Sequence, residues 1–294
     1  MFINIRLYFN LFFKYKMVHK INKLNQQGTS LQEIEVYNFI KMLLPNNKII
    51  KNDRTVLNGR EIDIYIPALK IGIEFNGLYF HSSNLKTDPY YHITKSIECE
   101  KKGIQLIQIM SDEWEQKKPL ILDLIRRTVN KVDTVNLQNC KIVEIDKQEG
   151  NIFLNNHSIN SYDKKSTLYY AVLLDNEKMA VASFKKGENN WILTRYTERK
   201  GYKVRDGLIS IINEFRKEHK GPITSSVDRR LFKGIELREA GFNEVKPTGP
   251  NVMYTKDFKK RIPPENLKRF KESDLESRGY YKVFDCGNRR FLLN

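Results

Sequence analysis

The fold of this chain follows from the stretch Gly59-Arg60-Glu61-Ile62-Asp63-Ile64-Tyr65-Ile66-Pro67 and, after three more residues, Ile71-Gly72-Ile73-Glu74-Phe75-Asn76-Gly77. Both segments alternate apolar and polar residues with a period of two, which predicts two adjacent strands joined by a turn. Asp63 and Glu74 each lie on the face opposite the isoleucines of their strand. Two carboxylates in otherwise apolar strands cost stability unless they are paired or bind a cation.

Two acidic oxygen ligands on neighbouring strands suit a hard divalent ion such as magnesium. Asp63 and Glu74 therefore form a candidate metal site, of the kind that hydrolyses phosphodiester bonds. The alternative is that both carboxylates face solvent on a surface sheet.

A helix is expected upstream of these strands. The pattern Ser30-x-x-Glu33 is a capping-box signal before the apolar run 34–44. Glu33 projects onto the apolar stripe that Tyr37, Ile40 and Leu44 form. It is either an N-terminal cap or a third acidic ligand.

The segments that follow extend the α/β pattern. Asp88-Pro89 opens a helix that closes at Lys102-Gly103, and the nearly continuous apolar run 104–110 predicts a strand covered on both faces. A further helix is expected from Pro119 to about Lys131. The sequence thus predicts a mixed α/β layer structure.

Residues 30–131 resemble the PD-(D/E)XK nuclease superfamily, in its very-short-patch-repair-like branch with the EDxHD motif that phage-type homing endonucleases use. The motifs are Ser30-x-x-Glu33, residues 59–63, residues 73–82, Tyr91-His92-x-x-Lys95, and residues 102–107 leading to Asp112-Glu113-Trp114. The resemblance implies a restriction-endonuclease-like mixed sheet flanked by helices. It also implies Asp63 as the central metal ligand, Glu33 as the helix-borne carboxylate and His81 as a general base.

One departure concerns the third motif of that superfamily, acid-x-Lys, which reads Glu74-Phe75-Asn76 here. Asn76 cannot supply the positive charge or the base of that lysine, so Lys95 or a histidine would take its place. The expected mechanism is hydrolysis of double-stranded DNA, with Mg²⁺ or Mn²⁺ held by Asp63, Glu74 and Glu33 and a water activated by His81, His92 or Lys95. His92 and Lys95 could equally face solvent. Asp112 is either functional or the cap of the next helix.

Composition agrees with a nucleic-acid partner, because 51 Lys and Arg face 35 Asp and Glu for a net charge of +16. An AT-rich coding sequence would also enrich lysine. The three cysteines Cys99, Cys140 and Cys286 are widely spaced without a metal-ligand pattern, which predicts an intracellular, cytoplasmic protein. Polar residues interrupt every apolar stretch, including 1–17, so neither a membrane span nor a signal peptide is expected.

The second half begins near Asn139 with expected strands at 141–145, 169–174, 179–184, 191–196, 223–227 and 252–254 and helices at 204–219 and 232–240. This order resembles the acyltransferase fold of the GNAT type, and residues 237–242 resemble its penultimate helix and turn. The phosphate-binding loop of that fold carries closely spaced glycines, whereas residues 203–208 hold only Gly207, so no small-molecule cofactor is expected. The same half also resembles the C-terminal module of phage homing endonucleases of this branch.

The expected organisation is a basic extension (1–28), a nuclease domain (29–137), a GNAT-like α+β domain that contacts DNA (138–258) and a basic tail (259–294). Its candidate DNA-contacting residues are Lys200, Lys203, Arg229, Arg230, Lys260 and Arg261, each of which could instead be a solvated surface charge. The chain would act as a monomer or a homodimer.

Three classes of function remain: a site-specific homing endonuclease, which is the main prediction; a mismatch-directed nicking enzyme; and a GNAT-type acyltransferase or a non-catalytic DNA-binding protein.

Overall fold

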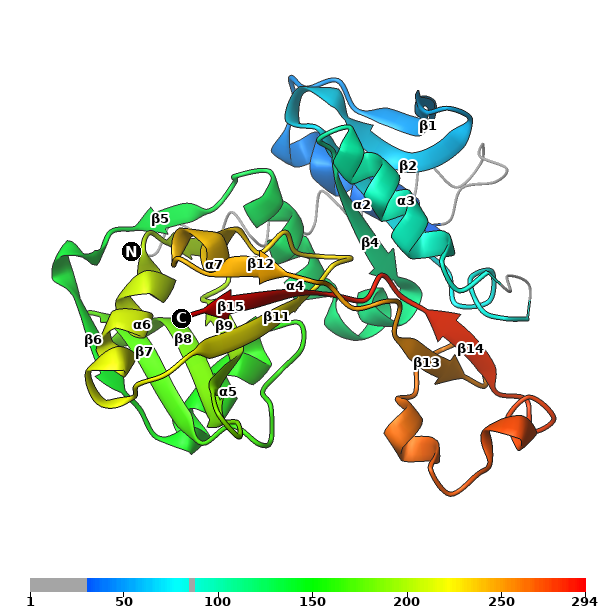
Figure 1. Cartoon of the computed structure of the whole chain (residues 1–294). Coiled ribbons are helices and arrows are strands. Elements are labelled where there is room, and N and C mark those ends of the chain that lie inside the picture. The colour runs from blue at the N-terminus through cyan, green and yellow to red at the C-terminus, as the bar shows by residue number, and fades with distance from the viewer. Residues whose placement is uncertain (1–30, 85–87) are drawn as a thin grey trace. The chain divides into compact units, whose positions relative to one another are not determined.

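The computed structural model describes residues 31–84 and 88–294 (Figure 1). The expected extension 1–28 and the capping residue Ser30 lie outside these ranges. By their internal contacts, the described residues 31–39 belong to one unit, and the second runs from Ile40 to Asn294. Helix α2 (Leu31–Leu43) supplies the described part of the first unit and the beginning of the second.

A four-stranded sheet holds the segments quoted first from the sequence. Its strands follow the order β1 (Ile50–Leu57), β2 (Arg60–Ile66), β3 (Ile71–Asn76) and β4 (Gln105–Met110). The first three are antiparallel, and β4 runs parallel to β3 after the crossover helix α3 (Tyr91–Lys101). Isoleucines of β2 and β3 are buried as their alternation predicts. Residues 78–83 form turns rather than a strand end.

Helix α4 (Ser111–Thr128) starts eight residues before the expected Pro119. Lys117 has non-helical backbone angles, so α4 is two helical pieces joined at a kink just before Pro119. Proline removes a helical N–H, and its ring clashes with the carbonyl four residues earlier, so a kink in the turn before Pro119 is expected. The first piece begins at Met110, whose N–H donates to Glu113 at 3.2 Å.

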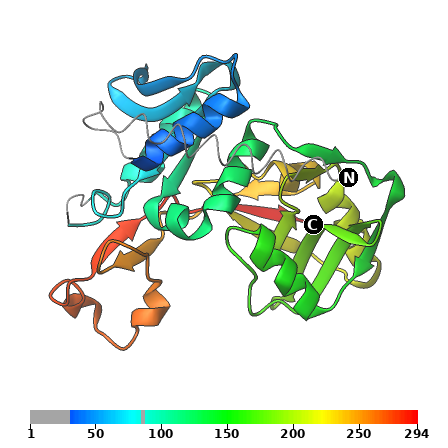
Figure 2. The same ribbon diagram turned by 180° about the vertical axis from the view of Figure 1, so that it is seen from behind.

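The larger sheet has seven strands in the order β12-β15-β11-β9-β8-β7-β6 (Figures 1 and 2). Four of them, β6 (Cys140–Glu144), β7 (Leu168–Leu174), β8 (Glu177–Lys186) and β9 (Trp191–Glu198), form an antiparallel meander. Strand β11 (Ile223–Asp228) then runs parallel to β9 after helix α6 (Gly207–Glu218). Helix α7 (Ile235–Glu239) leads to β12 (Asn243–Val245) at the edge.

Helices cover both faces of this sheet. On one face, Phe153 and Leu154 of α5 (Lys147–His157) pack on Tyr169, Ala171 and Val181. On the other, Leu208, Ile211, Ile212 and Phe215 of α6 pack on the alternate strand residues Tyr170, Val172, Ala180 and Ala182. The chain is therefore a mixed α/β protein, as predicted.

The C-terminal residues differ from the expected tail. Strand β15 (Asn288–Leu293) is inserted in the seven-stranded sheet between β12 and β11, antiparallel to both. Before it, β13 (Val252–Thr255) and β14 (Tyr281–Phe284) form a separate antiparallel pair, and short 3₁₀ turns lie between them. A parallel pair, β5 (Asp133–Val135) with β10 (Tyr202–Val204), completes the strands. No helix among the described residues is both long and apolar enough to cross a membrane.

A buried ion-pair network joins residues distant in sequence. The Arg230 guanidinium, 3% exposed, donates to Glu113 at 2.7 Å and to Asp228 at 2.6 Å. Arg261 contacts Glu113 at 2.7 Å and Asp112 at 2.9 Å. Burial raises the pKa of Glu113, but the two guanidinium groups outweigh burial and hold this pKa well below its ordinary range.

We expect Arg230→Met to lower the free energy of unfolding by about 3–5 kcal/mol, because the buried Asp228 loses its cation and Glu113 keeps only Arg261. The difference in unfolding free energy between parent and variant should become smaller as the pH falls below the ordinary pKa of Glu113. A carboxyl whose pKa is lowered in the folded state stabilises the fold fully above its ordinary pKa and less below it. Urea unfolding at several pH values measures both effects. Arg290→Met, at an exposed position of β15, is the matched control and should stay within about 0.5 kcal/mol. Equal effects of the two variants would contradict the network's role.

Candidate functional site

The two carboxylates singled out from the sequence lie side by side. Ile64 of β2 pairs with Ile73 of β3, which places Asp63 next to Glu74. The Phe75 N–H donates to Asp63 Oδ2 at 2.8 Å, and the Asp63 N–H donates to Glu74 Oε1 at 3.3 Å. Two oxygens of the predicted metal site are thus engaged by backbone N–H groups.

Lys95 of α3 occupies the position of a cation at this pair. Its Nζ lies 2.5 Å from Glu74 Oε2, and the two side chains are only 4% and 6% exposed. Burial, followed by the Asp63 charge, raises the pKa of Glu74 to about 8, and Lys95 partly offsets both. The arrangement is a buried ion pair, so the solvent-facing alternative for Lys95 is wrong.

The histidines near this pair are also packed. His92 is 3% exposed, and its Nδ1 lies 2.8 Å from the Gln108 side-chain oxygen, so it does not face solvent either. The His81 ring lies 4.9 Å from that of His92. Glu33 is half-buried in the first turn of α2, in the first unit, and its predicted role as a third acidic ligand stays a prediction.

Three of the predicted DNA-contacting residues form ion pairs within the protein. Arg230 and Arg261 belong to the Glu113 network, and Arg229 lies 2.5 Å from Glu100. The buried Arg230 is not accessible to a duplex, which corrects its predicted role.

The other candidates differ in exposure. Lys200 and Lys260 are exposed, and Lys203 lies half-buried on β10. Asp112 binds Arg261 and does not act as the expected helix cap.

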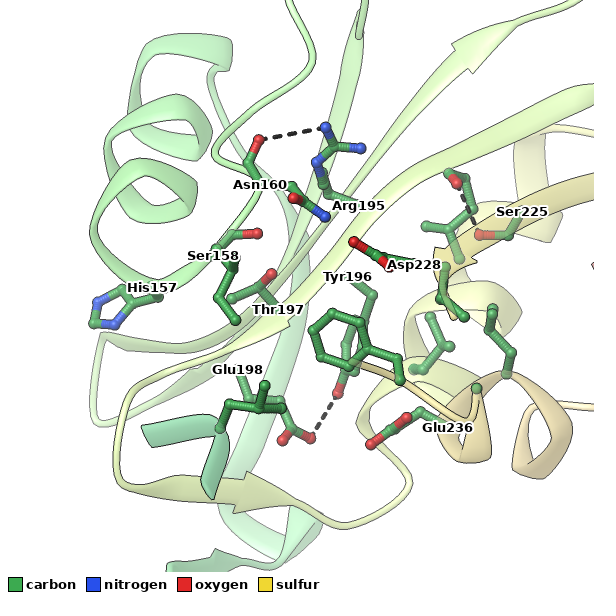
Figure 3. Close-up of a pocket in the computed structure, with 18 of the residues that line it drawn as sticks. His157, Ser158, Asn160, Arg195, Tyr196, Thr197, Glu198, Ser225, Asp228 and Glu236 are labelled. Carbon is green, nitrogen blue, oxygen red and sulfur yellow. Dashed lines mark hydrogen bonds between the residues drawn. The ribbon is translucent and has the colours of Figure 1, made fainter. Parts of the chain in front are cut away.

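A cleft opens where β9 and β11 part. These parallel neighbours pair only at their first residues, from Trp191 with Ile223 to Leu193 with Ser225. Thr194 is then an extra residue in β9, because Leu193 pairs with Phe184 and Arg195 with Ser183. Such a bulge bends a strand and redirects its side chains. Beyond it the strands enclose a cavity of about 170 Å³ (Figure 3).

Side chains bind two backbone carbonyls of β9 next to the bulge. The Ser225 hydroxyl donates to the Leu193 carbonyl at 2.9 Å, and the Arg195 guanidinium donates to the Thr194 carbonyl at 2.6 Å. Buried carbonyls need such partners. The sheet therefore tolerates an opening between two of its central strands.

Two titratable side chains of β9 meet in this cleft. The Tyr196 hydroxyl donates to Glu198 Oε1 at 3.1 Å, and Figure 3 shows both side chains lining the cavity. Glu198 also accepts from the Val204 N–H at 3.0 Å and pairs with Arg127 at 2.5 Å. Burial raises the pKa of Glu198 although Arg127 opposes it, and burial followed by Glu198 raises the pKa of Tyr196 well above its ordinary value.

A second cavity, of about 310 Å³, shares Tyr196, Glu198 and Glu236 with the first and reaches the N-terminus of α6. Asp206 precedes that helix with a left-handed backbone (φ 57°), and its side chain forms no capping hydrogen bond. Lys203 and Arg205 line the same cavity. A Cβ on Gly207 would lie 2.6 Å from the Tyr196 hydroxyl, so only glycine fits at this helix start.

The sequence prediction did not identify Tyr196 and Glu198 as a pair. Their i, i+2 spacing on an expected strand was the available signal, since it places two side chains on one face. The contact of Glu198 with Arg127, however, joins residues 71 positions apart in the sequence.

No family model matches this chain, and no curated protein matches it. Several solved structures match about half of it. They include the ribosomal-protein-S18-alanine N-acetyltransferase of Escherichia coli (11% identity, 52% of this chain and 92% of that one, TM-score 0.33). A Bacillus subtilis acetyltransferase in complex with CoA matches at 13% identity over 53% and 97%, TM-score 0.33. A putative streptothricin acetyltransferase of Bacillus anthracis in complex with acetyl coenzyme A has 12% identity, and the match covers 54% of this chain and 99% of that one with a TM-score of 0.33.

The prediction of a metal-dependent DNA endonuclease is wrong, and so is that of Mg²⁺ or Mn²⁺ as its cofactor. These solved structures are described as acetyltransferases, two of them with coenzyme A or its acetyl ester. Within residues 31–84 and 88–294, no group of three or more His, Cys, Asp or Glu side chains could hold a metal ion. The physical reason at Glu74 is that a lysine already supplies the positive charge.

We expect Lys95→Met to lower the free energy of unfolding by about 3–5 kcal/mol near pH 9, because Asp63 and Glu74 lose their buried cation. The loss should be smaller near pH 6, where a carboxyl with a raised pKa binds a proton and the charge disappears. Urea unfolding of the double variant Lys95→Met/Glu74→Gln should recover most of the stability.

Lys102→Met, at the exposed end of the same helix, is the control and should change stability by less than about 0.5 kcal/mol. A double variant no more stable than Lys95→Met alone would show that Lys95 does not act through Glu74.

Proposed function

We propose that this chain is an acyl-coenzyme A-dependent acyltransferase whose site is the cleft between β9 and β11. The single observation that carries the proposal is the parting of two central parallel strands directly after the Thr194 bulge. This GNAT-like arrangement gives an elongated, amide-bearing ligand a place inside the sheet, beside strand edges that can form hydrogen bonds.

The anionic end of such a cofactor fits the N-terminus of α6. Backbone N–H groups of a first helical turn favour phosphate, and the Asp206 side chain does not cap this one. Lys203 and Arg205 add positive charge, and neither forms an ion pair among the described residues. Gly207 keeps this helix start compact enough for Tyr196 to lie against it.

The inner end of the cleft holds groups suited to proton transfer. When bound, acyl-coenzyme A supplies an activated thioester. Glu198, whose pKa is raised, suits the acceptance of a proton from an incoming amine. Tyr196 keeps its proton at neutral pH and can donate a hydrogen bond into the cleft. Arg127 keeps the Glu198 carboxylate in place from the opposite side.

Coenzyme A should bind this protein, and the double variant Lys203→Ala/Arg205→Ala should weaken binding by about 10-fold or more, because each lost charge removes a phosphate contact. Isothermal titration calorimetry measures the dissociation constants. Lys217→Ala/Lys220→Ala, in the last turn of α6 and just beyond it, is the matched double-charge control and should bind as the parent does. Failure of the parent protein to bind coenzyme A would overturn the proposal.

Glu198→Gln should lower the rate of acyl transfer to an amine by about 10²–10⁴-fold while coenzyme A binding is kept. The parent rate should rise with pH as Glu198 loses its proton, with a midpoint above the ordinary carboxyl pKa, and the variant should lose this dependence. Release of free thiol from acetyl-coenzyme A with a panel of amines measures the rate. An unchanged pH profile in Glu198→Gln would exclude Glu198 as the proton acceptor.

A further inference from the structure

We propose that the acceptor of the acyl group is a short peptide whose carboxylate binds Arg195 on the α5 side of the β9–β11 cleft. Such a peptide is the second substrate of the proposed acyltransferase, on whose function this inference rests. Arg195 is half-buried and lines the cleft, but it does not line the cavity that reaches the N-terminus of α6.

The Arg195 guanidinium is held by backbone carbonyls rather than by a carboxylate. It donates to the carbonyls of Ser161 at 2.9 Å, Thr194 at 2.6 Å and Asn160 at 3.4 Å. A guanidinium has five N–H groups, and the described residues supply neither an acceptor for the other two nor a carboxylate at ion-pair distance. Because carbonyl groups carry no net charge, the positive charge of Arg195 stays uncompensated.

The carboxylate that acts on Arg195 is already balanced by another cation. Burial lowers the pKa of Arg195, and the charge of Asp163 opposes this shift only in part. The Asp163 carboxylate lies 3.0 Å from Lys185 Nζ and accepts the Lys165 N–H at 2.8 Å. An anionic group of a ligand would therefore supply the partner that Arg195 lacks, and a carboxylate matches the paired N–H groups of a guanidinium.

A second cation lies on the same loop. Lys117 is half-buried and donates to the Ile159 carbonyl, so cations contact the carbonyls of three successive residues, 159–161. Lys117 forms no ion pair among the described residues, and the carboxylates that act on it belong to the Glu113 network. This side of the cleft is positively charged, which favours the approach of a carboxylate.

Arg195 points to the face of the sheet opposite the proposed phosphate site. It pairs with Ser183 of β8, two residues from Val181, which packs on α5. Tyr196 pairs with Ala182, which packs on α6. Paired residues share a face, so Arg195 lies on the α5 side and Tyr196 on the α6 side. Figure 3 shows Arg195 next to Asn160 and apart from Glu198. An opening between two strands reaches both faces, so a second substrate can enter from the α5 side.

The distance along β9 favours a peptide over a free amino acid. Arg195 and Glu198 are three residues apart, which is about 10 Å of strand. One carbon atom separates the amine from the carboxylate in an α-amino acid, whereas three extended peptide residues span about 10 Å. Beyond Ser225, β11 pairs with β15 but not with β9, so its cleft side is a strand edge that can hydrogen-bond a peptide backbone.

The size of the cleft also favours a slender chain. Its cavity of about 170 Å³ is smaller than the 300–1,000 Å³ that is usual for small-molecule pockets. A peptide without large side chains fits such a space better than a bulky acceptor does. Glycine peptides are therefore suitable probes.

The proposed reaction joins the amino terminus of the peptide to the acyl group. The neutral amine nitrogen forms a bond to the thioester carbonyl carbon, and the carbon–sulfur bond breaks. The Glu198 carboxylate accepts the proton that the nitrogen loses and returns it to the leaving thiolate. The products are an N-acyl peptide and coenzyme A, and the peptide carboxylate stays on Arg195 throughout.

The test compares initial rates of thiol release from acetyl-coenzyme A with glycine, diglycine, triglycine, and triglycinamide, which lacks the carboxylate. We expect triglycine to have the lowest KM and triglycinamide a KM about 10-fold higher or more, because a charge-assisted pair is lost. Arg195→Gln should raise the KM of triglycine to that of triglycinamide and leave the KM of triglycinamide unchanged. Arg195→Lys keeps the charge and should recover part of the difference.

Arg199→Gln is the matched control and should change neither KM, because Arg199 pairs with Glu177 and does not line the cleft. The unchanged reaction of triglycinamide shows in the same sample that Arg195→Gln is folded. A preference for succinyl-coenzyme A that depends on Arg195 would place the bound carboxylate on the acyl donor and overturn the proposal. A lower KM for glycine than for triglycine would contradict a peptide acceptor.

Isothermal titration with coenzyme A separates this inference from the function on which it rests. If the parent protein binds coenzyme A but acylates triglycine no better than triglycinamide, or not at all, the acceptor is wrong while the cofactor site stands. If the parent protein does not bind coenzyme A, the acyltransferase proposal fails and this inference fails with it.

Discussion

The parting of β9 from β11 is the constraint on which the proposed site depends. A sheet is stabilised by continuous hydrogen bonding between neighbours, yet here two central strands share only the pairs from Trp191–Ile223 to Leu193–Ser225. The Thr194 bulge redirects β9, and the side chains of Ser225 and Arg195 bind the Leu193 and Thr194 carbonyls at this point. The opening is therefore built into the fold, and it brings Tyr196 and Glu198 beside the N-terminus of α6.

Charge in the interior of this protein is arranged in pairs rather than in open sites. Lys95 lies against Glu74, and Arg230 lies between Glu113 and Asp228. A buried carboxylate with a lysine or arginine at hydrogen-bonding distance has its charge balanced already. Glu198, paired with Arg127, and Asp228, paired with Arg230, also line the β9–β11 cavity.

Local features of the structure could be predicted from the sequence. Alternation identified β2, β3 and the β7–β8 hairpin, whose turn residues Asp175 and Asn176 adopt the positive φ values that such turns require. The closeness of Asp63 and Glu74 also followed from periodicity and a short connection. These features depend on residues within about ten positions of each other, where backbone geometry leaves few alternatives.

Long-range features could not be predicted in the same way. Strand β15 pairs with β11 some 60 residues earlier in the chain, and no local pattern specifies that insertion. The ion pairs of Arg229 with Glu100 and of Arg230 with Glu113 could not be predicted, because the partners lie more than 100 positions apart in the sequence. Helix α5 was missed although Asp146 caps it, with the Gln148 N–H donating to its side chain at 2.6 Å. The sequence shows Lys95 but not the 2.5 Å between its Nζ and Glu74 Oε2. At that distance the lysine balances the charge of Glu74, so no metal ion is needed for this purpose.

The most direct test of the central claim is hydrogen–deuterium exchange of the full chain with and without coenzyme A. If the parted strands hold this cofactor, the backbone N–H groups of residues 194–198 and of the first turn of α6 should become protected together. The β13–β14 pair should exchange unchanged. Protection confined to other segments, or none at saturating coenzyme A, would contradict the account.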